Sequence, residues 1–329
     1  MFSVSIFLLL QAPVGAAKPE VWVNPPGFNN GKCFRQLFEH PDQWAETRKW
    51  IDVLAYADHQ LNRQFTQAEI NAWLPMIEKW GLKFGLEVGA VKEWGVTGTK
   101  VFNQEKVYWD KFLASGVSIF AMAMDEPFWA VRDKIGETDE YAVEQTAIFM
   151  SLVRQNYPTV LLGSIEPYPA FTKDEIIFWI DALQARCQQK GIRGMDFVRL
   201  DVNWILFNKQ LRGNWQEVKQ IENHCRAKGI PFSLIYWAAD SPFLKTKGLS
   251  YDETWYVGIF RQAYDYAAIG GSPDRYTLSS WIDIPSESVP ETADWTFTRS
   301  VLDFCRRFVG EPRSPTQTLK ATPAWPRYK

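Results

Sequence analysis

Histidine is scarce in this sequence: there are three among 329 residues. Transition-metal sites in enzymes usually include histidine ligands, so this scarcity argues against a metal-dependent enzyme, and no bound metal is predicted. Four cysteines are present, but none forms a CxxC pair, which argues against a zinc site of the usual spacing. Nucleotide-cradling GxGxxG and GxxxxGK[ST] motifs and the GxSxG motif of serine hydrolases are also missing. We therefore expect no cofactor and no serine or cysteine nucleophile.

Long runs of one charge sign are absent as well. The formal net charge is −2, and 22% of the residues are charged. Nothing in this pattern indicates a nucleic-acid surface or a patch for anionic membranes. No run of 18 or more apolar residues occurs, so the sequence predicts no membrane-spanning helix.

The two ends of the chain differ in composition from the rest. Residues 1–17 combine an apolar stretch with small residues before Lys18, which resembles a secretory signal peptide although no cation precedes the apolar stretch. On this basis we expect a secreted or periplasmic protein. Residues 311–329 are rich in proline and threonine and show no periodicity, so they are interpreted as a tail. Residues 18–310 remain as the catalytic domain.

Aromatic residues are abundant, with 16 Trp, 12 Tyr and 22 Phe. Some of them must fill the core that a chain with 46% apolar residues can form. Tryptophan also offers a flat face and one polar N–H, which suits stacking against sugar rings. The composition thus fits either a large aromatic core or a carbohydrate site.

Short apolar runs alternate with longer amphipathic segments along the chain. The expected strands are residues 20–25, 50–57, 82–90, 117–124, 159–166, 195–203, 231–239 and 276–284. Between them, helix starts are marked by capping boxes such as Thr66 with Glu69 and Thr172 with Glu175. Eight strand–helix units predict a single (β/α)₈ TIM barrel. The alternative, an open doubly wound sheet, lacks its glycine-rich phosphate motif.

In such a barrel the chemistry lies at the carboxyl ends of the strands, and at least six of the eight expected ends carry a carboxylate. Two of them repeat one pattern, because Glu126 and Glu166 each close an apolar run and precede a proline and an aromatic residue. Proline removes a backbone donor, so we expect each strand to end there and to mount its glutamate rigidly. The repeat suggests two walls of one active site.

The run Asp125-Glu126-Pro127 resembles the Asn-Glu-Pro that ends strand four in clan A of the (β/α)₈ glycoside hydrolases. The resemblance implies hydrolysis of O-glycosidic bonds in an oligo- or polysaccharide, with Glu126 as the acid/base. This chain departs from the clan in carrying Asp125 before the glutamate, and in lacking a glutamate at the end of strand seven. The resemblance identifies no individual family.

The second carboxylate stays open at this point. Glu166 is the first choice because it repeats the setting of Glu126, Asp240 would keep the clan A layout, and Asp201 would pair strand six with strand four. Glycosidic cleavage needs two such carboxylates, one as acid and one as nucleophile or base.

The other residues at the expected mouth are polar or aromatic and suit sugar binding. The candidate substrate-binding residues are Asn24, Glu87, Asp125, Trp129, Tyr168, Asn203, Trp204, Tyr236, Trp237, Trp281 and Asp283. For any single tryptophan, packing in the core is an equally good interpretation. Two rival hypotheses remain, a non-catalytic sugar-binding barrel and a metal-dependent barrel enzyme.

Overall fold

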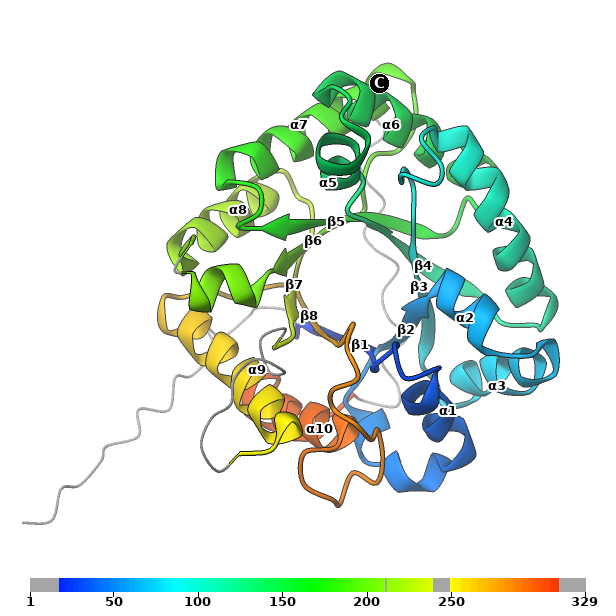
Figure 1. The fold of residues 1–329 in the computed structure, drawn as a ribbon, viewed down its shortest axis with the longest axis vertical. Helices are drawn as coiled ribbons and strands as arrows, with labels where there is room; N and C mark the ends of the chain where they lie inside the picture. The colour runs from blue at the N-terminus through cyan, green and yellow to red at the C-terminus, as the bar shows by residue number, and fades with distance from the viewer. Residues whose placement is uncertain (1–17, 211, 239–248, 314–329) are drawn as a thin grey trace, which may run out of the picture.

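The computed structural model describes residues 18–210, 212–238 and 249–313. Eight parallel strands close into a barrel in sequence order, with helices outside it (Figure 1). The strands are β1 (Glu20–Asn24), β2 (Val53–Ala57), β3 (Lys83–Val88), β4 (Ile119–Asp125), β5 (Leu161–Tyr168), β6 (Phe197–Val202), β7 (Phe232–Tyr236) and β8 (Arg275–Ser279). The predicted TIM barrel is confirmed.

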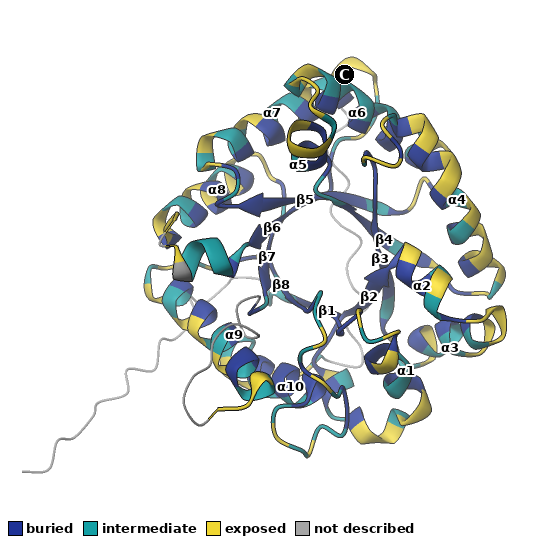
Figure 2. Ribbon diagram, in the orientation of Figure 1, coloured by how far each residue is buried: buried dark blue, intermediate teal, exposed yellow. Residues whose placement is uncertain are grey.

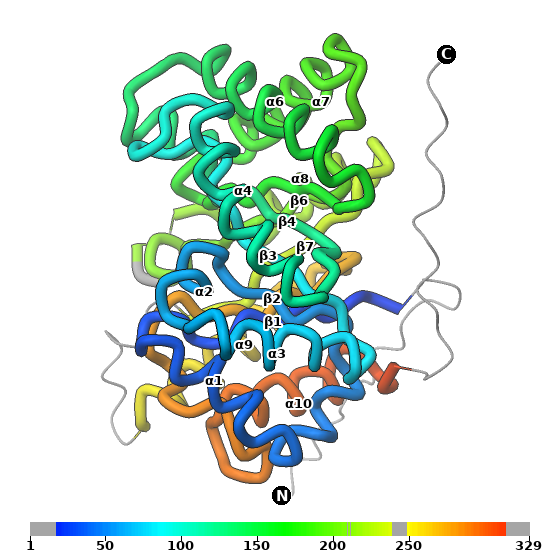
Figure 3. The backbone as a smooth tube through the Cα atoms, turned by 90° about the vertical axis from the view of Figure 1, so that its right-hand side faces the viewer, coloured from blue at the N-terminus to red at the C-terminus, as the bar shows by residue number. Residues whose placement is uncertain are grey.

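A layer of helices covers the outside of the strands, as the view along the side of the barrel shows (Figure 3). The main helices are α1 (Lys32–Glu39), α2 (Asp58–Gln64), α3 (Gln67–Lys79), α4 (Gly98–Ala114), α6 (Asp139–Asn156), α7 (Lys173–Gln189), α8 (Trp215–Ala227), α9 (Tyr251–Ala268) and α10 (Phe297–Phe308). Shorter turns are η1 (Pro41–Trp44), η2 (Thr47–Lys49), α5 (Pro127–Trp129), η3 (Ala130–Ile135) and η4 (Ile205–Lys209). Thr66 and Thr172 form the predicted capping boxes.

Side chains alternate between the two faces of each strand, and this parity decides which residues can reach the interior of the barrel. The larger apolar cluster lies between strands and helices (Figure 2). A smaller cluster fills the interior and includes Trp22, Ala123, Ile165, Phe197 and Ile235. The barrel is therefore a packed core beneath its mouth rather than a pore.

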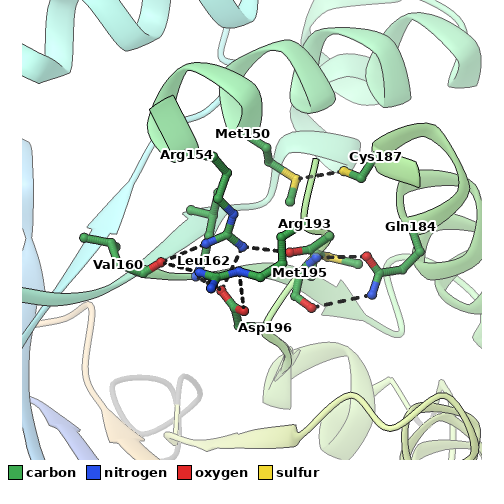
Figure 4. A network of polar contacts seen from close by, with 10 residues as sticks. Met150, Arg154, Val160, Leu162, Gln184, Cys187, Arg193, Met195 and Asp196 are labelled. Carbon is green, nitrogen blue, oxygen red and sulfur yellow. Dashed lines mark hydrogen bonds and ion pairs between the residues drawn. The ribbon is translucent and has the colours of Figure 1, made fainter. Parts of the chain in front are cut away.

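A buried ion-pair network ties the start of β6 to α6 and β5 (Figure 4). Asp196 accepts a hydrogen bond from the Arg154 guanidinium at 2.8 Å and from the Leu162 N–H at 2.7 Å. Arg193 adds a second guanidinium, with Nε 3.1 Å from the Asp196 carboxylate. The Arg154 and Asp196 side chains are 8% and 3% exposed, so the pair is shielded from water.

Gly98, the first residue of α4, sits against the backbone of α6. A Cβ at this position would lie 2.1 Å from the Gln145 carbonyl oxygen and 2.8 Å from the Phe149 nitrogen. Neither atom can swing away as a side chain would, so Gly98→Ala is expected to lower the free energy of unfolding by about 1–3 kcal/mol. Chemical denaturation checks this, with Thr99→Ala, an exposed change at the next residue, as a control. Equal stability of the two variants would contradict the close approach.

Three sequence predictions fall on residues outside the described ranges. These are the signal peptide at 1–17, most of the tail at 311–329 and the candidate catalytic residue Asp240. Within the described residues, no helix combines the length and apolarity needed to cross a membrane. The four cysteines are all described, and each is a buried free thiol.

Candidate active site

A pocket of about 620 Å³ opens at the carboxyl ends of β3 and β4. Its walls come from the strand ends, the connection between β3 and α4, and the turn after β4. Among its lining residues are Glu87, Lys92, Trp94, Glu105, Asp125, Glu126 and Trp129. This volume falls within the range of about 300–1,000 Å³ that small-molecule sites occupy. The mouth of the barrel therefore contains a pocket, as expected, and this pocket lies on the β3–β4 side.

Glu126 stands at the edge of this pocket in a strained backbone conformation. Its φ and ψ are 48° and 47°, in the left-handed region, directly after β4 and before Pro127. Two backbone hydrogen bonds fix it there, from its own N–H to the Ile165 carbonyl at 3.1 Å and from the Ala130 N–H to its carbonyl at 2.9 Å. Such strain in a non-glycine residue persists only where its surroundings enforce it, and it concentrates at functional sites.

The Glu126 carboxylate makes no hydrogen bond or ion pair within the described part of the chain. Burial raises the pKa of this carboxyl well above its usual range, and the nearby carboxylates of Asp125 and Asp201 raise it further. A carboxylate with a raised pKa takes up a proton more readily than that of an ordinary glutamate, as a general base must.

The Glu166 carboxylate, by contrast, accepts hydrogen bonds from backbone N–H groups. Its Oε1 accepts from the Phe128 N–H at 3.0 Å and its Oε2 from the Trp129 N–H at 3.2 Å. These bonds satisfy the first N–H groups of the turn that follows Glu126, as a helix cap does. Burial raises the pKa of Glu166 to about 8, although both N–H groups oppose the shift.

The expectation that proline ends the strand after Glu166 was wrong. Pro167 continues β5 and is in register with Asp201 of β6. Glu166 also has the parity of Leu162 and Tyr168, which pack outward against the helices, whereas Ile165 faces the interior. The two Glu-Pro pairs therefore present their glutamates differently, since Glu126 lines the pocket and Glu166 binds backbone N–H groups.

Lys92 brings a cation into the pocket. It lies on the connection between β3 and α4, and its ammonium is 2.6 Å from the Asp125 carboxylate. Burial alone would lower the pKa of Lys92, but Asp125, with further help from Glu126 and Glu87, raises it overall. The ammonium is therefore charged at neutral pH and held among carboxylates.

Two indole N–H groups bind the remaining carboxylates of the mouth. Trp281 Nε1 donates to Glu87 at 3.2 Å, and Trp237 Nε1 donates to Asp201 at 2.7 Å. The two indole rings meet edge to face, 5.0 Å apart. Burial raises the pKa of Glu87 to about 8, with Asp125 as the second cause, and burial raises that of Asp201 to about 7.

The structure places the other predicted substrate-binding residues in different settings. Tyr168, Trp204 and Tyr236 are 0%, 2% and 1% exposed and belong to the packing between strands and helices. Asn203 accepts a hydrogen bond from the Leu206 N–H at 3.2 Å, at the start of η4. Trp129 lines the pocket, whereas Asn24 is buried at the end of β1 and Asp283 is exposed.

Lys92 and Glu105 are pocket residues that the sequence interpretation missed. Lys92 follows no strand directly, and Glu105 lies inside a helix. The available signal was the short segment between Gly89 and Gly95, which holds one lysine and one exposed tryptophan, Trp94. Two glycines around so few residues indicate a tight connection that returns toward the mouth.

The fold and the pocket define a (β/α)₈-barrel protein with an acidic, lysine-bearing mouth. No family model and no curated protein matches the chain. Among solved structures, the YdjI aldolase from Escherichia coli K12 is 10% identical with a TM-score of 0.47, over 90% of this chain and 94% of the aldolase. The HMG-CoA lyase of Bacillus subtilis is 10% identical with a TM-score of 0.48, over 92% and 97%. A Bombyx mori aldo-keto reductase in complex with NADP is 11% identical with a TM-score of 0.44, over 79% of each chain. These similarities show the fold alone.

The expectation of a glycoside hydrolase was wrong. The three similar structures named above are an aldolase, a lyase and an aldo-keto reductase, and none of these three is a glycoside hydrolase. The site gives a physical reason, because Glu166 holds backbone N–H groups on the outward side of β5 and Asp201 is bound by Trp237. Several aromatic residues that we expected to stack on sugar rings are buried in the core.

Proposed function

We propose that the chain is an enzyme that moves a proton at a carbon atom next to a carbonyl group, with Glu126 as the base. One observation carries the proposal. Four of the carboxylates near the mouth, those of Glu87, Asp125, Glu166 and Asp201, each bind a donor. The carboxylate of Glu126 binds none within the described residues, faces the pocket and has a raised pKa.

The Lys92 ammonium supplies the second requirement of this chemistry. When a base takes the proton from carbon, the electron pair moves to the carbonyl oxygen and leaves an enolate. A fixed cation stabilises that negative oxygen more in the transition state than in the ground state. Asp125 holds Lys92 in place at 2.6 Å, so the charge is positioned before the substrate arrives. Isomerisation, aldol cleavage and related lyase reactions all pass through such an enolate.

The direct test is exchange of substrate hydrogen for solvent deuterium. The wild-type protein would be incubated in D₂O with hydroxyketones, 2-oxo acids, 3-hydroxy acids and sugar phosphates, and followed by proton NMR. We expect loss of the signal at the carbon next to the carbonyl for at least one of these compounds. Exchange that proceeds equally well with Glu126→Gln would contradict the proposal.

Lys92→Met should lower kcat on the substrate so identified by about 10²–10³-fold, the usual effect of removing one group that stabilises an oxyanion. The reason is loss of the cation at the enolate oxygen, so KM should change less than kcat. Steady-state kinetics measures both. Lys134→Met is the matched control, because Lys134 lines the exposed edge of the same pocket. Similar losses in both variants would show only a need for positive charge in the pocket.

A further inference from the structure

At the wall of the pocket, α2 and α4 bury two carboxyl groups that the proposed reaction does not use. Asp58 is 0% exposed and Glu105 is 2% exposed. One oxygen of each is bound: Trp109 Nε1 donates to Asp58 Oδ2 at 2.8 Å, and the Gly89 N–H donates to Glu105 Oε1 at 2.8 Å. The other two oxygens, Asp58 Oδ1 and Glu105 Oε2, have no hydrogen-bond partner among the described residues and no access to solvent.

The helix geometry places the Glu105 side chain near Asp58. Glu105 precedes Trp109 by four residues on α4, so both side chains leave the same face of the helix, one turn apart. Trp109 reaches one oxygen of Asp58. Glu105 therefore faces the same carboxyl group, and the charge of Asp58 acts directly on it.

Two adjacent buried carboxylates cannot both stay ionised, because each disfavours the charge of the other. Burial raises the pKa of Asp58 to about 7 and raises that of Glu105 as well. The neighbouring charges do not remove the conflict, since Asp125 is negative and Lys92 is paired with it. His59 Nδ1 lies 3.8 Å from Asp58 Oδ1, too far for a hydrogen bond, and burial lowers the pKa of His59. A single proton between the two carboxyls would satisfy both free oxygens.

We propose that Asp58 and Glu105 share one proton, and that this pair positions the connection between β3 and α4. Glu105 holds the N–H of Gly89, where that connection begins, and the next residue, Ala90, has a φ of 70°. A non-glycine residue in this region needs enforcement by its surroundings. The consequence for Lys92, three residues after Gly89, rests on the proposed function, whereas the shared proton does not.

Thermal unfolding between pH 5 and pH 9 tests the shared proton. Both carboxyls have folded-state pKa values above their unfolded values near 4, so they reduce wild-type stability as the pH rises from about 4 to their folded-state values. Glu105→Gln keeps the acceptor for Gly89 and gives Asp58 a permanent N–H donor. Its Tm relative to the wild type should therefore rise with pH, by about 2–4 °C per kcal/mol of relieved repulsion.

Glu222→Gln is the control, because the pKa of this carboxyl is shifted in the opposite direction. Glu222 is equally buried but is paired with Lys219 and Arg226, and its pKa is lowered. This variant should be less stable than the wild type by a constant amount over the same pH range. If the Tm of Glu105→Gln relative to the wild type stays constant or falls as the pH rises, the shared proton is overturned. If that variant does not fold, Asp58→Asn must show the same upward trend.

Hydrogen exchange at the Gly89 amide and kinetics separate the two parts of the proposal. In the wild type, Gly89 exchange should increase with pH more steeply than intrinsic base catalysis alone predicts, because the shared proton is lost. Over the same alkaline pH range, kcat/KM should fall. Glu105→Gln should weaken both trends. Tm and Gly89 exchange can behave as expected while the alkaline fall of kcat/KM is the same in Glu105→Gln as in the wild type. In that case the shared proton stands and its role for Lys92 is overturned. Failure of the proposed function removes only the kinetic arm.

Discussion

Glu126→Gln is expected to lower kcat by about 10²–10⁴-fold, the range typical for loss of a general acid or base. The amide has the size of the carboxyl group but cannot take a proton from carbon. In the wild type, kcat/KM should rise with pH as Glu126 ionises, and the rise should be centred well above the usual pKa of a glutamate because burial raises this pKa. The variant should lose that rise.

Stability measurements distinguish catalysis from structural damage in this variant. The folded-state pKa of Glu126 is raised, so its ionisation reduces stability as the pH increases from the unfolded-state value toward the folded-state value. Glutamine is neutral, so Glu126→Gln should be at least as stable as the wild type at pH 8. Glu137→Gln, an exposed change on the same connection, is the control and should keep full activity. More than a tenth of wild-type activity in Glu126→Gln would contradict the role of base.

Asp196→Asn is expected to lower the free energy of unfolding by about 3–5 kcal/mol, the usual effect of breaking a buried ion pair from one side. Asparagine keeps the volume of the side chain but leaves the Arg154 guanidinium buried without its counter-ion (Figure 4). Urea denaturation with a two-state fit measures the loss. Asp181→Asn is the matched control, because Asp181 is 43% exposed and pairs with Lys228 near the surface. It should cost less than about 1 kcal/mol.

A second substitution tests the cause of that loss. If the uncompensated charge of Arg154 is responsible, Arg154→Met added to Asp196→Asn should recover part of the stability, because no buried unpaired cation remains and Arg193 is 41% exposed. A double variant that is less stable still would indicate that the hydrogen bonds from Arg154 to the Val160 and Gly194 carbonyls dominate. Activity should stay near wild type at temperatures where the single variant is folded, because this network lies at the starts of the strands, away from the mouth.

The sequence predicted the fold well because the strands of a parallel barrel are nearly continuous apolar runs, and because caps such as Thr66 and Thr172 are local signals. Glu126 was singled out for a similar reason, since an acid that closes such a run before proline is visible in the sequence. Its left-handed backbone was not, because this conformation depends on Ile165 of the neighbouring strand.

Other errors at the site have distinct physical origins. Glu166 looks like Glu126 over a few residues, but its role depends on N–H groups that lie 37 and 38 residues away in sequence. Tyr236 was taken for a mouth residue, although it shares the parity of Leu234, which packs outward. Lys92 reaches the pocket from a loop and Glu105 from a helix, so no pattern at the strand ends can reveal them.

The bonds from Glu166 to Phe128 and Trp129 also bear on how this protein can diversify. They anchor the chain within three residues of Glu126, before the long connection to α6 begins. The largely exposed stretch from Arg132 to Glu137 can therefore lengthen, shorten or change sequence while Glu126 keeps its position. Grafting a new loop after Val131 is thus a practical route to altered selectivity, provided that Glu166 is kept.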